Sequence, residues 1–506
     1  MSSPSPTDTV MVSDSEHQME LNEKSEIRGV KFDKLEGPID EGYSWVICAC
    51  VATLNFCTWG MNSGFAIYLA YYLDHDTFDN MSKIDYSYIG GMAFGIGLFF
   101  SPLVNSLYNS IGIKPMIILG NCIQFTALML ASFATNRWQI FCTQGLLQSF
   151  GLAVLSIPMM TIIPQYFDKH RILAGGLGTC GSGLGGLVFN LGMYKVTQKV
   201  SVFWALRAQS IISFGMIWIA TFFLKSKVKR GSSTVRLLDN LDVYFKVDFW
   251  LLSAFITTCI LGYVILLYTL AAFTVSLGYT AHQGSIVSAM VQLGLLIGRP
   301  CVGLLSDRIG PVTMAFICYG ICGILCFAMW IPARNYATVI VFALFEGAMM
   351  GCIYGMLSPT VQRIYGQHKM TSVFSKLWMF VGVAGVFSPV IGIKLTKGNG
   401  IEVDPTSYLN CSIFAGSTFL GAAMFLLLLR GHVNAREHMI VALNKESDVS
   451  DVLSIHSDMK VTLPMILASC IKSPIKRQFD KVVSISHTEE GEEFEEKIVE
   501  FRSAVI

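Results

Sequence analysis

Long apolar runs separated by short polar segments dominate this chain of 506 residues. The runs are long enough for helices that cross a bilayer, which need about 20 residues each. They fall into two sets of six on either side of a polar segment, 225–247. The pattern predicts an all-α membrane protein with twelve transmembrane helices in two six-helix pseudo-repeats. The expected helices are Ser44–Leu73, Tyr86–Leu107, Pro115–Ala134, Gln139–Tyr166, Leu173–Met193, Val202–Leu224, Phe249–Leu277, Gly284–Leu305, Val312–Ile331, Tyr336–Tyr365, Thr371–Leu395 and Tyr408–Leu429.

The polar segments divide the chain into five parts. Residues 1–43 are rich in Ser, Asp, Glu and Lys and predict a disordered cytosolic arm. No signal peptide is visible, so the first apolar run is expected to act as an uncleaved anchor. Two six-helix bundles, 44–224 and 249–430, are expected to flank a central cytosolic loop, 225–248, and to be followed by a cytosolic tail, 431–506.

Lysine and arginine residues outside the runs predict the orientation. They are frequent in the loops on the side of the two termini and sparse on the other side. The positive-inside rule therefore predicts that both termini are cytosolic, with the plasma membrane and the vacuolar membrane as equal alternatives. Asn80-Met81-Ser82 is a candidate glycosylation site in the first outer loop.

Composition supports a membrane protein and excludes other classes. The chain is 53% hydrophobic and 14% charged, with a mean hydropathy of +0.55, whereas a soluble domain carries about 25% charged residues. The net charge of +1 argues against a nucleic-acid partner. We expect the lipid bilayer as the main partner and no obligate protein partner.

Two motifs suggest cofactors but are better explained by helix packing. Cys318, Cys322 and Cys326 share a helix face, but in an apolar span they are expected to be small packing residues, so no metal is predicted. Gly176–Gly181 fits the dinucleotide pattern GxGxxG, yet it lies inside a membrane span rather than after a strand. Gly181 and Gly185 instead favour close helix–helix contact. No cofactor is expected.

A repeat relates the second helices of the two sets. Ser101-Pro102 followed by Asn109–Gly112 matches Arg299-Pro300 followed by Asp307–Gly310 at a constant offset without a gap. Parallel repeats of this kind are typical of the major facilitator fold, in which the substrate site lies near the bilayer midplane between the halves.

Arg299 is the strongest candidate for a binding residue. An arginine deep in a bilayer costs roughly 2.5–3.5 kcal/mol, so it normally faces a cavity or a partner. The eight residues to Asp307 place Arg299 about 12 Å from the aqueous turn, which is deep for a headgroup anchor. The alternative is an arginine that snorkels to the headgroups.

Other polar and aromatic residues in the spans complete a candidate site. Asn62 and Gln292 are amides that lipid would penalise, and Trp59 and Tyr68 are candidate lining residues. Glu346 is the only carboxylate well inside the second half's spans. Because burial favours the neutral form, it is a candidate for proton coupling, with pairing to Arg299 or a place near the outer rim as alternatives.

Three segments resemble the monocarboxylate transporter family. Asp40–Trp45 resembles its first signature, Tyr166–Gly176 its second, and Gly303–Gly310 the general major facilitator loop motif. The resemblance covers about 40–430, and details such as Trp59–Gly64 look most similar to the yeast monocarboxylate transporter homologues.

The resemblance implies roles for individual residues. Arg299-Pro300 matches the family's arginine-proline in helix eight, whose arginine binds the substrate carboxylate. The family's aspartate four residues earlier is Leu295 here, and its helix-one lysine falls at about Ser63, so two of the three residues of the family's proton and anion relay are absent. Gating candidates are Asp307, Arg308, Asp168 and Arg171.

The sequence therefore predicts a secondary transporter of a small monocarboxylate-like organic anion that works by alternating access, with a co-transported proton as an open question. Two alternatives are a carrier of a larger, weakly anionic metabolite such as a vitamin, and a nutrient sensor that signals through its tail without transport. No nucleophile–base pair or metal cluster stands out, so an enzyme is not expected.

Overall fold

The computed structural model describes residues 41–74, 77–78, 81–167, 170–227, 241–365, 367–396, 404–444, 466, 469–470, 481–486 and 495–500. The first half contains α2 (Tyr43–Asn55), α3 (Met61–Ser63), α4 (Phe65–Asp74), α5 (Lys83–Phe99), α6 (Ser101–Ile111), α7 (Ile113–Ala131), α8 (Arg137–Ile140), α9 (Gln148–Met160), α10 (Arg171–Lys199) and α11 (Val202–Phe223). The second half contains α12 (Val247–Ser276), α13 (Ala281–Ile309), α14 (Pro311–Leu325), α15 (Tyr336–Met350), α16 (Ile353–Tyr365), α17 (Gln367–Leu395) and α18 (Leu409–Asn444).

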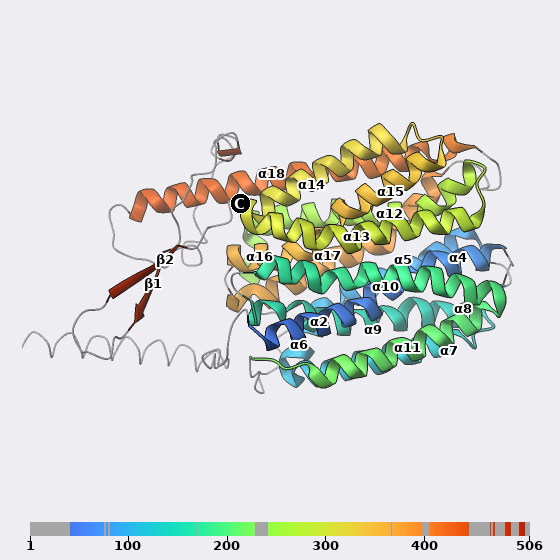
Figure 1. The fold of residues 1–506 in the computed structure, drawn as a ribbon, viewed down its shortest axis with the longest axis horizontal. Helices are drawn as coiled ribbons and strands as arrows, with labels where there is room; N and C mark the ends of the chain where they lie inside the picture. Colours follow the sequence, from blue (N-terminus) through green and yellow to red (C-terminus); the bar gives the residue numbers. More distant parts are fainter. Residues whose placement is uncertain are drawn as a thin grey trace, which may run out of the picture.

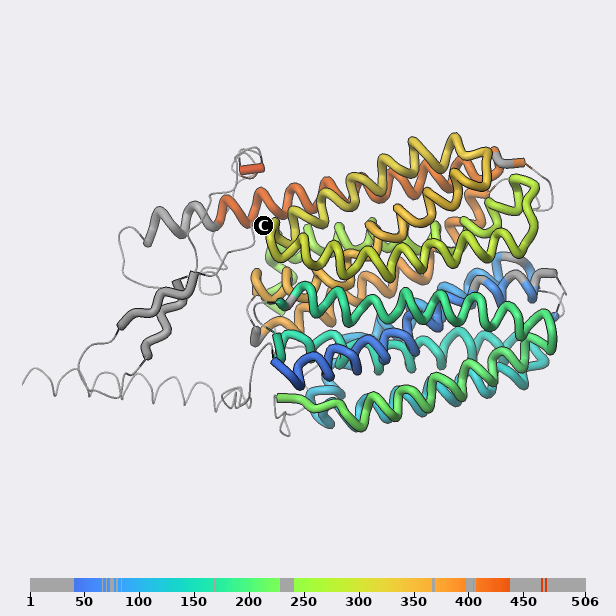
Figure 2. Tube along the Cα trace, viewed as in Figure 1, coloured from blue at the N-terminus to red at the C-terminus, as the bar shows by residue number. Residues whose placement is uncertain are grey.

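The helices run roughly parallel to one another as a bundle (Figure 1). Among the described residues, eleven helices are long and apolar enough to cross a membrane, or twelve if the bent pair α5–α6 is one span. The all-α membrane fold predicted from the apolar runs is therefore confirmed. Figure 2 shows the helices of the first half on one side of the bundle and those of the second half on the other.

The two halves meet along two pairs of helices that are themselves related by the repeat. In one pair α10 packs against α13, and in the other α5 packs against α17. Gly176 lies so close to α13 that an added Cβ would be 2.6 Å from the carbonyl oxygen of Arg299. Glycine therefore allows the close approach that positions Arg299 at the interface.

The glycines of α10 pack helices, as the sequence predicts. A Cβ on Gly185 would lie 2.9 Å from Cα of Phe56, and one on Gly181 would overlap the backbone of Ala52. A Cβ on Gly60 would in turn lie 2.7 Å from Cα of Gly185. The motif that fits a dinucleotide pattern thus belongs to a crossing between the first and fifth spans.

The second span is broken, which the sequence pattern does not predict. Helices α5 and α6 form an angle of 53° at Phe100. Pro102 lies in the first turn of α6, where its missing N–H leaves no hydrogen bond unmade. In the second half, α13 passes Pro300 without interruption.

The last span extends beyond its expected end at Leu429, because α18 continues to Asn444. Within this extension, Arg436 donates from Nη1 to Oδ2 of Asp248 at 2.5 Å, and His432 lies beside the same carboxylate. All three side chains are buried. The expected soluble tail thus begins as a helix that is ionically tied to the start of α12. Further along, strands β1 (Lys481–Ser486) and β2 (Glu495–Glu500) pair antiparallel.

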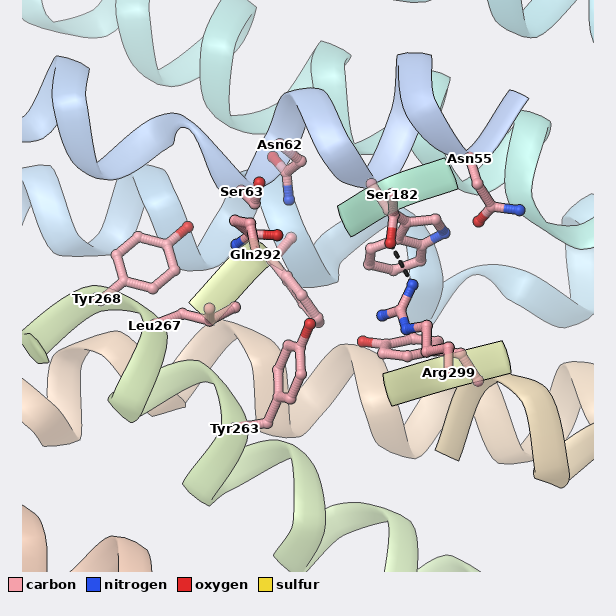
Figure 3. A pocket seen from close by; sticks show the side chains of 12 residues that line it. Asn55, Asn62, Ser63, Ser182, Tyr263, Leu267, Tyr268, Gln292 and Arg299 are labelled. Carbon is pink, nitrogen blue, oxygen red and sulfur yellow. Dashed lines mark hydrogen bonds between the residues drawn. The ribbon is translucent and has the colours of Figure 1, made fainter. Parts of the chain in front are cut away.

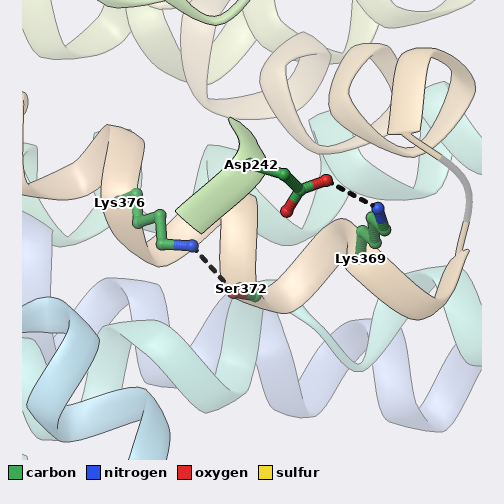
Figure 4. A network of polar contacts seen from close by, with 4 residues as sticks. All are labelled: Asp242, Lys369, Ser372 and Lys376. Atoms are coloured by element: carbon green, nitrogen blue, oxygen red, sulfur yellow. Dashed lines mark hydrogen bonds and ion pairs between the residues drawn. The ribbon is translucent and has the colours of Figure 1, made fainter. Parts of the chain in front are cut away.

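The central loop also contacts the second half. Asp242, in a short 3₁₀ turn before α12, accepts a bond of 3.0 Å from Lys369 at the start of α17 (Figure 4). Partial burial would raise the pKa of Asp242, but the hydrogen bond and charge of Lys369 outweigh it and hold that pKa below its ordinary value. Lys376 is directed to Ser372 on the same helix.

Candidate functional site

A cavity lies between the two halves at the α10–α13 contact (Figure 3). The cavity has a volume of about 30 Å³, measured as the space open to the centre of a water molecule. This is room for about two waters. An organic acid therefore fits only if the halves separate or side chains move. The lining residues are Asn55, Trp59, Asn62, Ser63, Phe94, Ser182, Tyr263, Leu267, Tyr268, Gln292, Arg299 and Tyr354.

Arg299 is buried in this cavity rather than among headgroups or lipid. Its side chain is 4% exposed, and its Nη1 donates to the backbone carbonyl of Thr179 and to the hydroxyl of Ser182, both on α10. The guanidinium carbon lies 5.1 Å from the ring centroid of Tyr354, within the range of a cation–π contact. Nε has no hydrogen-bond partner among the described residues. The arginine thus bridges the two halves and retains an unused donor.

A glycine makes space for this side chain. Gly351 ends α15, and a Cβ there would lie 2.8 Å from Nε of Arg299. The same Cβ would lie 2.3 Å from Cδ2 of Leu295, so a larger residue would force the side chains of Leu295 and Arg299 to shift. The break between α15 and α16 therefore helps to set the position of the positive charge.

Amide and hydroxyl groups gather on the other side of the cavity, where Figure 3 shows Asn62, Ser63 and Gln292 close to one another. Oδ1 of Asn62 is buried without a partner among the described residues. Gly186 on α10 leaves room for this group, since a Cβ there would lie 2.7 Å from Oγ of Ser63 and would overlap the end of Gln292. The cavity thus combines one cation with neutral polar groups.

Aromatic rings form an apolar wall next to Arg299. The ring of Trp59 lies 5.3 Å from Phe94, 5.5 Å from Tyr354 and 5.5 Å from Trp378, measured between centroids. Nε1 of Trp59 and the hydroxyl of Tyr354 have no hydrogen-bond partner among the described residues. These groups supply apolar surface and two further donors beside the cation.

Two of the candidate residues, Tyr68 and Glu346, lie outside the cavity. Tyr68 packs within the first half, where its hydroxyl donates to Gln209. The first span contains a π-helical segment, Phe56–Gly60, and a break at Gly64, so regular helical spacing from Trp59 does not predict where Tyr68 points.

Glu346 is fully buried on α15 and faces α14 instead of the cavity. Its Oε1 accepts from the thiol of Cys326 at 3.9 Å, and its Oε2 has no partner among the described residues. Nη1 of Arg299 is directed to α10, and no Glu346–Arg299 ion pair is formed among the described residues. The side chain is 0% exposed.

The gating candidates lie at the end of α13 away from its start at Ala281. Oδ2 of Asp307 accepts from the backbone N–H of Leu173 at 3.2 Å, near the start of α10, while Arg308 is exposed. Asp168 lies outside the described residues, as does the side chain of Arg171. The glycosylation candidate Asn80 also lies outside them.

The halves touch on both sides of the cavity. Towards the end of the bundle with the α18 extension, Asp307 meets Leu173, and the hydroxyl of Ser101 donates to the carbonyl of Ser375 at 2.5 Å. Towards the other end, the rings of Tyr194 on α10 and His282 on α13 lie 6.0 Å apart. The structure therefore describes a conformation in which the halves are in contact on both sides of the cavity.

Sequence reasoning did not single out Ser182, Thr179 or Gly351. Ser182 lies within the glycine run, where small residues are explained by packing alone. Gly351 stands among apolar residues with no polar neighbour. Ser182 could have been noticed as a hydroxyl residue on the helix whose glycines allow close helix–helix contact.

Comparison with curated proteins identifies close relatives. The chain is 42% identical to "Probable transporter MCH2" of Saccharomyces cerevisiae over 89% of this chain and 94% of the relative, a name that stands for monocarboxylate transporter homologue. It is 29% identical to "Uncharacterized transporter ESBP6" of the same yeast, over 78% of this chain and 60% of that protein. It is 26% identical to "Agnestins efflux protein AgnL12" of Paecilomyces divaricatus, over 74% and 85%.

A solved structure supports the fold. The proton:xylose symporter XylE, a major facilitator protein bound to a glucose analogue, superposes with a TM-score of 0.60 and 12% identity, covering 76% of this chain and 94% of that one. The family model "Major Facilitator Superfamily" matches residues 48–389 and 250–442. The resemblance to the yeast monocarboxylate transporter homologues is confirmed, and the chain belongs to the Major Facilitator Superfamily, a family of membrane carriers rather than enzymes.

Proposed function

We propose that this transporter carries a small organic anion with a carboxylate, by alternating access of the cavity to the two sides of the membrane. The observation that carries the proposal is the buried guanidinium of Arg299 at the interface between the halves. A buried cation needs an anionic or strongly accepting partner. A carboxylate accepts bidentate hydrogen bonds from a guanidinium, which makes it a well-matched ligand.

The remaining lining groups suit the part of such a ligand that lies beyond its carboxylate. Asn62 and Gln292 are available to bind a carbonyl or hydroxyl group, while Trp59 and Tyr354 favour an apolar portion. The ligand that matches this lining best is therefore a short carboxylic acid with one further polar group and an apolar end.

The contact at the end of α13 supplies a candidate gate. Asp307, with its bond to Leu173, would hold one side closed and release it when the halves rock. Arg308, at the same end of α13, is a second gating candidate. Asp168 and Arg171 are further gating candidates from the sequence.

Energy coupling is the second part of the proposal. Glu346 is the candidate proton carrier, supported by its complete burial and by an oxygen that has no partner among the described residues. It lies on the far side of α15 from the cavity, so a proton on Glu346 would act through the position of α15 rather than by contact with the anion. The alternative is that the substrate brings its own proton.

The orientation proposed from the loop charges places both termini in the cytosol. The Asp307–Leu173 contact then closes the cytosolic side and the Tyr194–His282 contact the opposite side. A cysteine-accessibility assay in intact cells, with single cysteines at Arg334 and Lys369, tests this. Labelling of the Lys369 position from outside would contradict the orientation.

A carrier of larger weak acids is the second candidate. Two observations favour it: the aromatic wall around Trp59, and the presence of efflux proteins for agnestins and aspyridones among the relatives, which are 24–26% identical. Such a substrate needs more room than the enclosed cavity provides. Transport of a bulky aromatic acid in preference to pyruvate would support this candidate.

Uptake of a panel of radiolabelled acids into vesicles, with and without a pH gradient, tests the proposal. Because Arg299→Ala removes the cation and the two hydrogen bonds that its guanidinium would donate to the substrate carboxylate, we expect the half-saturation concentration to rise about 100-fold. Arg334→Ala is the matched control, since Arg334 is exposed in a loop. Unchanged anion uptake by Arg299→Ala would overturn the site.

Glu346→Gln tests the coupling role separately. The amide keeps the shape but cannot take up a proton, so we expect uptake to lose its dependence on the pH gradient while the half-saturation concentration stays within about twofold, because the residue does not line the cavity. Thr257→Ala is a control, since that hydroxyl bonds only within α12. A variant with the parent's pH profile would remove Glu346 from the coupling mechanism.

A further inference from the structure

Arg299 receives its acceptors from the protein itself in the enclosed conformation. One nitrogen, Nη1, donates to both the carbonyl of Thr179 and the hydroxyl of Ser182. Figure 3 shows the bond to Ser182. Both acceptors belong to α10 in the first half, whereas Arg299 belongs to α13 in the second. The two bonds therefore form across the interface at which the halves move.

The cavity volume shows why these bonds matter. About 30 Å³ leaves no room for an organic acid beside the guanidinium while the halves are in contact as described. A buried guanidinium without acceptors carries a large desolvation cost. In the conformation described, the carbonyl of Thr179 and the hydroxyl of Ser182 offset this cost without a bound anion, together with the ring of Tyr354.

We infer that Ser182, together with the Thr179 carbonyl, is a surrogate for the substrate carboxylate that lets the unloaded carrier change sides. This inference rests on the proposed function of Arg299 as the anion-binding residue. A carrier that can reverse only when loaded performs exchange alone. A carrier whose cation is satisfied by its own α10 can also return empty and so perform net transport.

The position of Ser182 suits this role. Its side chain is buried and lines the cavity, and its hydroxyl faces the guanidinium of Arg299. Its hydroxyl also donates to the carbonyl of Thr179 at 3.1 Å, which leaves the oxygen lone pairs for the arginine. Gly183, the next residue, fixes the distance between the helices, since a Cβ there would lie 2.6 Å from the backbone nitrogen of Leu296.

The anion and Ser182 compete for the same donor, which predicts the kinetic signature. In Ser182→Ala the empty enclosed state loses one acceptor, so net uptake slows. Exchange proceeds through loaded states in which the carboxylate satisfies Arg299, so its rate stays near that of the parent. The ratio of exchange to net uptake is therefore expected to rise about tenfold, the factor for one hydrogen bond to a charged group.

The experiment measures both rates in proteoliposomes with radiolabelled pyruvate and phenylpyruvate. Net uptake is measured into empty liposomes, and exchange into liposomes preloaded with the same unlabelled acid. The ratio does not depend on the amount of folded carrier, so poor folding of the variant does not affect it. Ser182→Cys, which keeps the size but is a weak acceptor, is expected to shift the ratio in the same direction.

Ser253→Ala is the matched control, because that buried hydroxyl donates only to Phe249 within its own helix. A rise in the ratio for both Ser182 variants, but not for the control, supports the inference. An unchanged ratio in a carrier whose uptake still depends on Arg299 overturns it and leaves the proposed function intact.

If neither acid enters in an Arg299-dependent manner, the proposed function itself fails, and the inference with it. The half-saturation concentration gives an independent reading. Loss of the competing acceptor predicts a lower value in Ser182→Ala, whereas loss of a direct substrate contact predicts a higher one.

Discussion

The two segments related by the internal repeat, α5–α6 and α13, have different geometries at equivalent positions. The first is bent by 53° just before Ser101-Pro102, while the second is continuous through Arg299-Pro300. Both end at a glycine with positive φ, Gly112 at 81° and Gly310 at 104°, a conformation that favours glycine. The turn is the same in both halves, whereas the middle of the helix differs.

Equivalent residues in these segments make equivalent contacts with different chemistry. Ser101 donates to the carbonyl of Ser375 on α17, and Arg299 donates to Thr179 and Ser182 on α10. One contact is made by a short neutral side chain, and the other by a long charged one. Both interfaces thus close by a hydrogen bond at equivalent positions of the repeat, but only the second has a charged donor, which under the proposed function an anion would compete for.

The largest difference between the two segments is expected when the space around Arg299 is filled. In Gly351→Ala the new methyl group would lie 2.3 Å from Cδ2 of Leu295 and 2.8 Å from Nε of Arg299, so these side chains must shift. We therefore expect the half-saturation concentration for the transported acid to rise about tenfold. Gly192→Ala on α10 is the control, because its Cβ meets no atom within 4 Å. Equal behaviour of both variants would mean that the position of Arg299 is not set by Gly351.

A smaller difference is expected at the helix ends. Asp307→Ala loses the bond to the Leu173 N–H, and we expect the maximal uptake rate to fall about fivefold, the factor for one hydrogen bond. Asn109→Ala at the equivalent position of the first half removes no charge and is expected to stay within about twofold. If both variants lose the same activity, the gate does not depend on the second half.

The smallest effect is expected at the neutral contact. Ser101→Ala removes the bond to Ser375, and a neutral hydrogen bond contributes about 0.5–1.5 kcal/mol, so uptake should change about threefold. Because no anion competes for this contact, the half-saturation concentration should not move. A shift in that value would show that the α5–α17 interface also responds to the substrate.

The fold follows from the sequence because the apolar runs are long and the charge pattern is simple. The bend at Phe100 was not predictable, since Pro102 and Pro300 are the same residue in the same repeat and only tertiary packing distinguishes them. The extension of α18 was also missed: His432 and Arg436 look like tail residues until Asp248 is seen beside them.

The sequence predicts those site residues whose polar side chains would be costly in lipid. It does not predict the small residues of the site. Arg299, Asn62 and Gln292 stand out because an apolar span makes them costly, and all three line the cavity. Tyr68 does not line it, because the irregular first span changes the direction of its side chain. Ser182 and Gly351 carry no such cost and become visible only through the atoms they meet.

The ion pairs at the start of α12 have a practical consequence for any shortened version of this protein. A chain cut after Leu429 would leave the carboxylate of Asp248 buried without Arg436 and His432, and removal of one side of a buried pair typically costs about 3–5 kcal/mol. Such a deletion would lower the amount of carrier and imitate the loss of a signalling tail. A cut after Asn444 keeps both partners and is the one that distinguishes a sensor from a carrier.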